Sequence, residues 1–294
     1  MATNKNYGYW KDRKVLFIGD SLTVARLYPE TVKDILGIEP YYHCKGGASL
    51  ISMIDGDYGR DGVYTPETDA QNIQRPLTPD DVRDMDLVVL YGGYNNRATN
   101  MGKVGDLYSP ADNGENTIAG FMQYAINRIY ENLFKADNMT CRLLIVTVDC
   151  AGKYPWLDVD GRHESVPNTG WTFEAMANIQ VEVARHNAIP CCDLFHTSGI
   201  NEHTWAYFGA CPYPENTNFT PYRLNEKGVP LSSERIRYVT GESYYQFRDG
   251  KVVLEKYEGV PPCPYNADQL HKSPAGYKRI GELIAGAIIS AYGN

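Results

Sequence analysis

The chain has 294 residues, which is enough for one large domain or two small ones and for a sizeable hydrophobic core. It carries 28 Lys and Arg against 36 Asp and Glu, a formal charge of −8, and has no basic run, which argues against nucleic-acid binding. No stretch approaches the ~18 apolar residues of a membrane span, and the first residues lack the apolar core of a signal peptide. The sequence leaves the compartment undecided between the cytoplasm and, for a trimmed chain, the periplasm or cell exterior.

Short apolar runs alternate with helical and polar segments in the first part of the chain. Lys14–Ile18 ends at a glycine and predicts a buried strand. Pro29–Leu36 predicts a helix, because proline suits the first helical position and a glycine follows the last. Tyr41–Cys44 and Leu87–Tyr91 predict a second and a third strand, whereas 55–80 is rich in Gly, Asp, Thr and Pro and predicts a loop.

The same alternation continues to the C-terminus. Ile118–Leu133 repeats apolar residues at helical spacing and predicts an amphipathic helix. Leu143–Val148 and Ile189–Phe195 predict the fourth and fifth strands, with a helix over Phe173–Val183 between them. The last helix begins at Pro274, with the preceding serine as its cap. Apolar strands that alternate with helices predict an α/β protein with a parallel sheet covered on both faces.

One segment, residues 196–264, contains no strand-plus-helix unit. Tyr244–Phe247 and Val252–Lys256, joined through Asp249-Gly250, predict a β-hairpin, and the rest is rich in Pro, Asn and aromatic residues. We interpret 196–264 as an insertion, and a candidate lid over the carboxyl edge of the sheet, within a single domain of residues 1–294.

The sequence predicts no metal site and no cofactor. None of the seven cysteines forms a C-x-x-C pair, which argues against a zinc ribbon or a thioredoxin-type site. Most of them lie in or beside apolar runs and are expected to be small buried side chains, and a disulfide between Cys211 and Cys263 stays open. His163-Glu164 lacks the second histidine of a zincin, and neither a G-x-G-x-x-G nor a P-loop occurs.

Four short segments lie at positions where α/β folds form ligand-binding and catalytic sites. They are Gly19-Asp20-Ser21-Leu22 after the first strand, Gly46-Gly47-Ala48-Ser49 after the second, Gly93-Tyr94-Asn95-Asn96 after the third, and Asp268-Gln269-Leu270-His271 before the last helix. In this order they resemble the SGNH (GDSL) hydrolase family, from about residue 12 to the end apart from the insertion. The resemblance implies a flavodoxin-like three-layer α/β/α sandwich around a mostly parallel five-stranded sheet, and a serine esterase activity.

The residues themselves suit nucleophilic catalysis. Ser21 follows a strand that ends at a glycine, so its hydroxyl can be displayed at the sheet edge, but it needs a base to become a nucleophile. His271 lies three residues after Asp268, a spacing that puts both side chains on one side of a helical turn. The aspartate can then orient the imidazole as the histidine accepts the serine proton. The resemblance implies the same roles.

Acyl transfer also needs hydrogen-bond donors for the carbonyl oxygen, which becomes negatively charged. Candidates are the side-chain amide of Asn95 and the backbone N–H groups of Gly47 and Ser21, the composition that the family implies, with Gly46 as a substitute for Gly47. The family's third block usually reads G-x-N-D, and here Asn96 replaces the aspartate that would brace the loop.

Further residues are candidates for substrate contacts: Asp20, Tyr94, Arg97 and Trp205. Aromatic residues gather after the fourth strand and in the insertion, where they either stack on a sugar or pack the insertion. We therefore predict an esterase that removes acetyl groups from a small-molecule or polysaccharide ester. The alternatives are a lipase, lysophospholipase or thioesterase, and a glycan-binding module without catalysis.

Overall fold

The computed structural model describes residues 8–56, 75–96, 100–110, 116–150, 172–201, 204, 208–209, 222–224, 230–235, 243–248, 251–256 and 270–293. The chain divides into two compact units. The first, which we call the sheet unit, comprises Met1–Val148, Ala175–Leu194 and Ile280–Asn294, and the second comprises Asp149–Glu174 and Phe195–Arg279. We describe each unit by itself and keep the single domain of residues 1–294 as a proposal.

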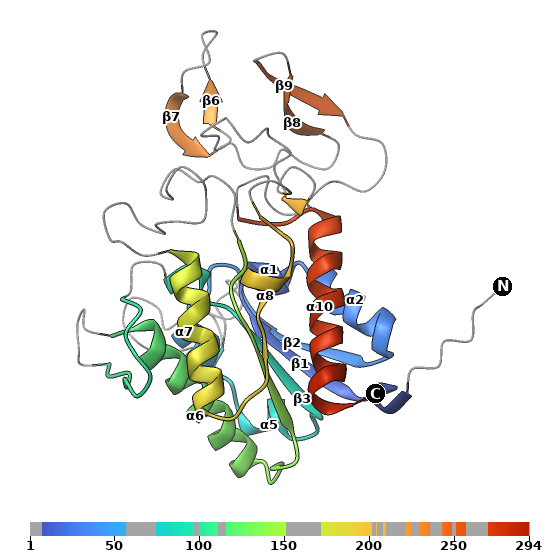
Figure 1. Cartoon of the computed structure of the whole chain (residues 1–294), viewed down its shortest axis with the longest axis vertical. Helices are drawn as coiled ribbons and strands as arrows, with labels where there is room; N and C mark the ends of the chain where they lie inside the picture. The colour runs from blue at the N-terminus through green and yellow to red at the C-terminus, as the bar shows by residue number, and fades with distance from the viewer. Residues whose placement is uncertain are drawn as a thin grey trace, which may run out of the picture. The chain divides into compact units, whose positions relative to one another are not determined.

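The sheet unit is built on five parallel strands in the order β2-β1-β3-β4-β5 (Figure 1). The strands are β1 (Lys14–Gly19), β2 (Glu39–Cys44), β3 (Leu87–Tyr91), β4 (Arg142–Val146) and β5 (Cys191–Cys192). The predicted five-stranded parallel sheet is confirmed, and its order is that of flavodoxin-like folds. β3 is the central strand and is buried over its whole length, as expected for a strand with helices on both faces.

Helices cover both faces of this sheet (Figure 1). On one face α2 (Leu27–Leu36) packs against α10 (Pro274–Tyr292) so closely that a Cβ at Gly281 would lie 2.5 Å from the Cβ of Thr31. The other face carries α3 (Leu50–Asp55), α5 (Pro79–Val82), α6 (Ile118–Lys135) and α7 (Phe173–His186). α6 contacts α3 and α5, and Gln123 on α6 bonds Asn187 just beyond α7. This arrangement follows from right-handed crossovers between parallel strands.

Two predicted helices are confirmed at their capped ends. α2 ends at Gly37, which adopts a left-handed conformation with φ 73°, although the helix begins two residues before the predicted Pro29. α10 begins at Pro274 as predicted, and the hydroxyl oxygen of Ser273 accepts a hydrogen bond from the N–H of Gly276 at 3.2 Å.

The predicted fifth strand is wrong over most of its length. Only Cys191–Cys192 pairs with β4, and the apolar residues that follow form α8 (Leu194–Thr197) instead. The hydroxyl oxygen of Thr147 accepts a hydrogen bond from the Leu194 N–H at 2.9 Å and so satisfies a backbone donor at the start of this helix. An apolar run of this length is compatible with a strand or a buried helix, which is why the run alone misled the prediction.

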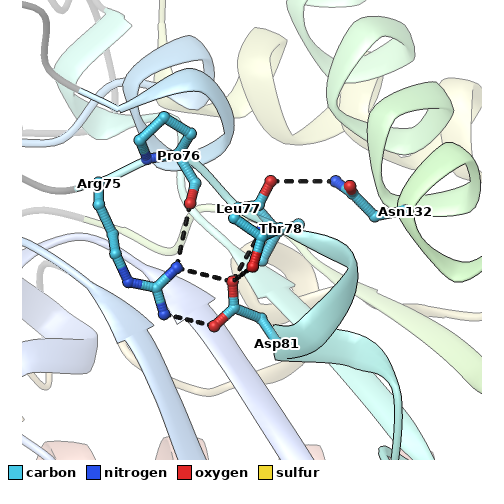
Figure 2. A network of polar contacts seen from close by, with 6 residues as sticks. All are labelled: Arg75, Pro76, Leu77, Thr78, Asp81 and Asn132. Carbon is cyan, nitrogen blue, oxygen red and sulfur yellow. Dashed lines mark hydrogen bonds and ion pairs between the residues drawn. The ribbon is translucent and has the colours of Figure 1, made fainter. Parts of the chain in front are cut away.

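The short helix α5 begins at the end of the segment predicted as a loop, 55–80, of which residues 57–74 lie outside the described residues. Figure 2 shows the polar contacts that form the start of this helix. Thr78 caps the helix, and Asp81 accepts hydrogen bonds from both the N–H (2.8 Å) and the hydroxyl (2.7 Å) of Thr78. The Arg75 guanidinium bonds both carboxylate oxygens of Asp81, and Asn132 on α6 donates to the carbonyl oxygen of Leu77 at 3.2 Å. These contacts fix α5 against α6.

The two ends of the sheet unit are joined at the amino ends of the strands. Trp10, in the 3-10 turn Gly8–Trp10, is fully buried, and its indole N–H donates to the carbonyl oxygen of Gly293 at 2.8 Å. The guanidinium of Arg142 lies 5.5 Å from the Trp10 ring and 4.9 Å from the Tyr292 ring.

The described residues of the second unit include two antiparallel strand pairs. The predicted hairpin is confirmed as β8 (Ser243–Arg248) paired with β9 (Lys251–Lys256). A second hairpin, β6 (Tyr222–Leu224) with β7 (Pro230–Arg235), was not predicted. In the part of the chain that the structure describes, no helix has the length and apolar character needed to cross a bilayer.

Candidate active site

The three candidate segments of the sheet unit leave neighbouring strands at the same edge. Gly19 at the end of β1 is in register with Cys44 on β2 and with Tyr91 on β3. From β1 the chain crosses to β2 on one side, and it later returns to β3 on the other side. Ligand sites of open α/β sheets form outside the carboxyl ends of the strands at such a switch point. Ser21 and Asn95 therefore emerge from the two strands that flank it.

A tight turn presents Ser21. Glycine is needed at position 19, because a Cβ there would lie 2.0 Å from the Thr23 hydroxyl oxygen and 2.7 Å from the Tyr91 carbonyl oxygen. Ser21 is the first residue of α1 (Ser21–Val24) and is half-buried. Asp20 is buried and caps α1 by accepting a hydrogen bond from the N–H of Leu22 at 3.0 Å.

The side-chain amide of Asn95 connects the three segments. Its nitrogen donates to the carbonyl oxygen of Ala48 at 3.0 Å and lies 3.4 Å from a carboxylate oxygen of Asp20. Ala48 follows Gly47, and Asp20 precedes Ser21. The structure thus brings Asn95 beside both of the backbone segments that carry the other candidate oxyanion donors.

Asn96 braces the loop that carries Asn95. Its side chain is buried, and its amide oxygen accepts a hydrogen bond from the N–H of Leu50, the first residue of α3, at 2.8 Å. An amide oxygen provides the acceptor that the family's aspartate would provide, so the departure at this position leaves the loop anchored.

The segment after β2 is open to solvent. Gly46 and Gly47 are both exposed, and a Cβ on either would meet nothing within 4 Å. Gly47 has φ +80°, so its backbone conformation rather than lack of room favours glycine there. Burial raises the pKa of the nearby Cys44 thiol to about 11, which keeps the thiol protonated and excludes it as a competing nucleophile at neutral pH.

Two candidates for substrate contacts lie in the interior. Tyr94 is fully buried, and its ring packs edge-to-face on that of Tyr91, with the two hydroxyl oxygens 3.4 Å apart. Asp20 is 1% exposed and makes the contacts to Leu22 and Asn95 described above. We therefore assign Asp20 and Tyr94 to the scaffold of the proposed site rather than to the substrate-binding surface.

His271 belongs to the second unit. It is buried and lies between Leu270 and Lys272, directly before α10. Its proposed partner Asp268 lies outside the described residues, as do the other candidates Arg97 and Trp205. The triad of Ser21, Asp268 and His271 therefore remains a prediction.

Sequence reasoning missed a buried ion pair next to His271. The ammonium nitrogen of Lys272 lies 3.1 Å from a carboxylate oxygen of Asp149, and neither side chain is exposed. The only signal was the position of Asp149 shortly after the fourth strand, and nothing in the sequence indicated that Lys272 is buried. Within the described residues, no group of three or more His, Cys, Asp or Glu side chains is arranged to hold a metal ion.

Of the cysteines that the structure describes, Cys141, Cys150 and Cys192 are buried, and Cys44 and Cys191 are partly exposed. This confirms their predicted character as small interior side chains. Cys211 and Cys263 lie outside the described residues, so the proposed disulfide is still a prediction.

Comparison with known proteins gives a fold. No protein-family model and no curated protein sequence matches the chain. Among solved structures, it is similar to a possible lipase from Chitinophaga pinensis, with a TM-score of 0.56 and 17% identity over 96% of this chain and 99% of the other. The chain has the fold of that structure, a three-layer α/β/α sandwich around a parallel sheet.

The chain is also similar, at lower TM-scores, to two further solved structures. One is a GDSL-like lipase from Parabacteroides merdae, with a TM-score of 0.47 and 8% identity over 96% of this chain and 98% of the other. The other is the acetyl xylan esterase AlAXEase, with a TM-score of 0.41 and 17% identity over 94% of this chain and 100% of the other.

Proposed function

We propose that the protein is a serine esterase of the SGNH (GDSL) family that hydrolyses short acyl esters, acetyl esters above all, on a carbohydrate. One observation carries the proposal: the Asn95 amide lies 3.0 Å from the Ala48 carbonyl oxygen and 3.4 Å from the Asp20 carboxylate. These contacts link the segments of the proposed nucleophile and oxyanion donors at the β1/β3 switch point of the sheet.

In the proposed reaction the hydroxyl oxygen of Ser21 attacks the acyl carbon while His271 accepts the hydroxyl proton. Asp268 accepts a hydrogen bond from the other ring nitrogen and stabilises the imidazolium. The C–O bond to the sugar then breaks, and His271 returns the proton to the leaving sugar oxygen. The acyl group is left as an ester on Ser21.

Water completes the proposed cycle. His271 accepts a proton from the water as its oxygen attacks the acyl-serine, and the proton then passes to the Ser21 oxygen as the carboxylic acid leaves. In both steps negative charge develops on the acyl oxygen. The N–H groups of Ser21 and Gly47 would donate hydrogen bonds to it. The Asn95 amide would donate a third by exchanging its 3.4 Å contact with Asp20 for the acyl oxygen, and such a donor typically contributes a factor of roughly 100 to 1,000 in rate.

The carbohydrate part of the proposal rests on composition. The chain has 23 Tyr and 4 Trp, and several of them fall in the insertion together with Asn and Pro, whereas residues 196–230 contain few Leu, Ile or Val. Aromatic faces stack on the C–H faces of sugars, and a pocket for long acyl chains would need aliphatic side chains.

The test is an ester panel on wild type and Ser21→Ala, with p-nitrophenyl acetate, p-nitrophenyl octanoate and acetylated oligosaccharides. We expect faster turnover of acetate than octanoate, turnover of acetylated sugars, and loss of both activities in Ser21→Ala. Ser290→Ala, which removes an exposed hydroxyl from α10, is the matched control and should retain full activity.

Covalent labelling with a fluorophosphonate separates specific from incidental ester hydrolysis. The reagent reacts with an activated serine, so we expect a mass increase on Ser21 that is absent in His271→Ala. Undiminished hydrolysis and labelling in Ser21→Ala would refute the proposal. A preference for octanoate would favour a lipase, lysophospholipase or thioesterase, and glycan binding without turnover would favour a non-catalytic module.

A further inference from the structure

Lys272 and Asp149 form an ion pair with no solvent access. Their charged atoms are 3.1 Å apart, and the exposed fraction of both side chains is 0%. Removing two charges from water is costly, and a buried pair is often no more stabilising than apolar side chains of similar size. A contribution to stability alone therefore does not account for this pair.

The Lys272 side chain holds the backbone next to His271. Its ammonium group also donates to the carbonyl oxygen of Leu270 at 2.6 Å, so one side chain spans the residue between them. The Lys272 ammonium thus ties the backbone before His271 to a carboxylate on a different segment of the second unit.

The backbone after His271 is held as well. Lys272 forms a β-bridge with Gly209, and the N–H of Ser273 donates to the carbonyl oxygen of Phe208 at 2.8 Å. Gly276 packs so closely on Phe208 that a Cβ there would lie 2.2 Å from the same carbonyl oxygen. The β-bridge and the Ser273 hydrogen bond hold the backbone after His271, and the hydrogen bond from the Lys272 ammonium group to the Leu270 carbonyl oxygen holds the backbone before it.

We infer that the Lys272–Asp149 ion pair positions the imidazole of His271 for proton transfer. Lys272 and Asp149 are thus both positioning residues. This inference rests on the proposed function, in which His271 is the base. Displacement of a catalytic group by about 1 Å can reduce the rate by about 100-fold without altering how the substrate binds. The pair would accordingly act on kcat and not on KM.

The experiment compares Lys272→Met, Asp149→Asn and the double variant with wild type. For each we would measure kcat and KM on p-nitrophenyl acetate, together with the thermal midpoint. Each single variant leaves one buried charge without its partner and should lower both the midpoint and kcat, with kcat falling about 10- to 100-fold and KM changing less than about threefold.

The double variant separates positioning from stability. Two neutral side chains carry no uncompensated charge, so the midpoint should return toward the wild-type value while kcat stays low. If kcat returns together with the midpoint, the pair only stabilises the fold and the inference is wrong. A double variant that does not fold also overturns it, because the pair would then be required for folding itself.

Two controls complete the design. Lys33→Met breaks an exposed pair of similar length, 3.2 Å to Glu30, and should change neither kcat nor the midpoint appreciably. Ser21→Ala distinguishes the two proposals. If Ser21→Ala retains activity, the proposed function and the inference are both wrong. If Ser21→Ala loses activity while Lys272→Met keeps the wild-type kcat, only the inference is wrong.

Discussion

Replacement of Asp81 by asparagine tests how the start of α5 is stabilised. The Asp81 carboxylate accepts a hydrogen bond from the Thr78 N–H at 2.8 Å and one from the Thr78 hydroxyl at 2.7 Å, and the Arg75 guanidinium bonds both of its oxygens (Figure 2). Asp81→Asn keeps the size of the side chain but removes the negative charge that these donors surround.

The magnitude follows from the pKa of Asp81. Burial alone would raise this pKa, but the hydrogen bonds from Arg75 and Thr78 outweigh burial and lower the pKa from 3.8 to about 2. The full difference corresponds to roughly 2 kcal/mol at about 1.4 kcal/mol per pH unit. The Arg75 side chain is 41% exposed, so solvent screening reduces the contribution, and we expect about 1 kcal/mol.

The sign of the pH dependence follows from the lowered pKa. The folded protein binds a proton at Asp81 less readily than the unfolded chain does, so the stabilisation is fully present above about pH 4 and is lost as the pH falls towards about 2. The measurement is the difference in unfolding free energy between wild type and Asp81→Asn, from urea titrations over this range. Other carboxyl groups largely cancel in that difference.

The neighbouring Asp80 provides the control. Its side chain is 85% exposed and pairs with Arg83 at 2.7 Å, so Asp80→Asn should change the unfolding free energy by less than about 0.5 kcal/mol at every pH. A difference between wild type and Asp81→Asn that stays constant from about pH 5 to pH 2 would refute the reasoning, as would a loss of equal size in Asp80→Asn.

Three further predictions concern the sheet edge and α10. Gly19→Ala should lower the unfolding free energy by about 1 to 3 kcal/mol, because the added Cβ has no room. Gly286→Ala, in open space on α10, should raise the unfolding free energy by up to about 1 kcal/mol. Thermal midpoints equal to that of wild type in both variants would contradict both expectations. Asn95→Ala should reduce kcat/KM for p-nitrophenyl acetate by about 100- to 1,000-fold, and a loss below about 10-fold would exclude Asn95 from the oxyanion site. Asn96→Asp should keep the acceptor for the Leu50 N–H and retain activity. Asn96→Leu removes that acceptor and should lower the unfolding free energy by about 1 to 3 kcal/mol. An equal loss of unfolding free energy in the two variants would contradict the bracing role of Asn96.

The sheet could be predicted because its strands carry a local signal. Residues 15–18 and Leu87–Tyr91 are continuous apolar runs followed by glycines, and buried parallel strands require that composition. Once their ends were known, Ser21 and Asn95 could be assigned to one edge, since parallel strands share their carboxyl ends.

What escaped prediction depends on contacts between distant parts of the chain. The apolar residues after Cys192 become helical where the side chain of Thr147 accepts the Leu194 N–H, which no local pattern reveals. The burial of Lys272 likewise follows from its tertiary contacts, and a lysine in a sequence is ordinarily expected at the surface. α5 is a different case, because Thr78, a proline at the first helical position and Asp81 together are a recognisable helix start.

The hydrogen bond from Trp10 to Gly293 has a practical consequence. Trp10 also accepts a hydrogen bond from the N–H of Arg13, the residue before β1, so positions 10 and 293 both lie where the strands begin. Ser21 and Asn95 follow the strands at their far ends. A tether, affinity handle or solid support attached at the exposed Gly293 would therefore hold the sheet unit by the end opposite the edge that carries Ser21 and Asn95.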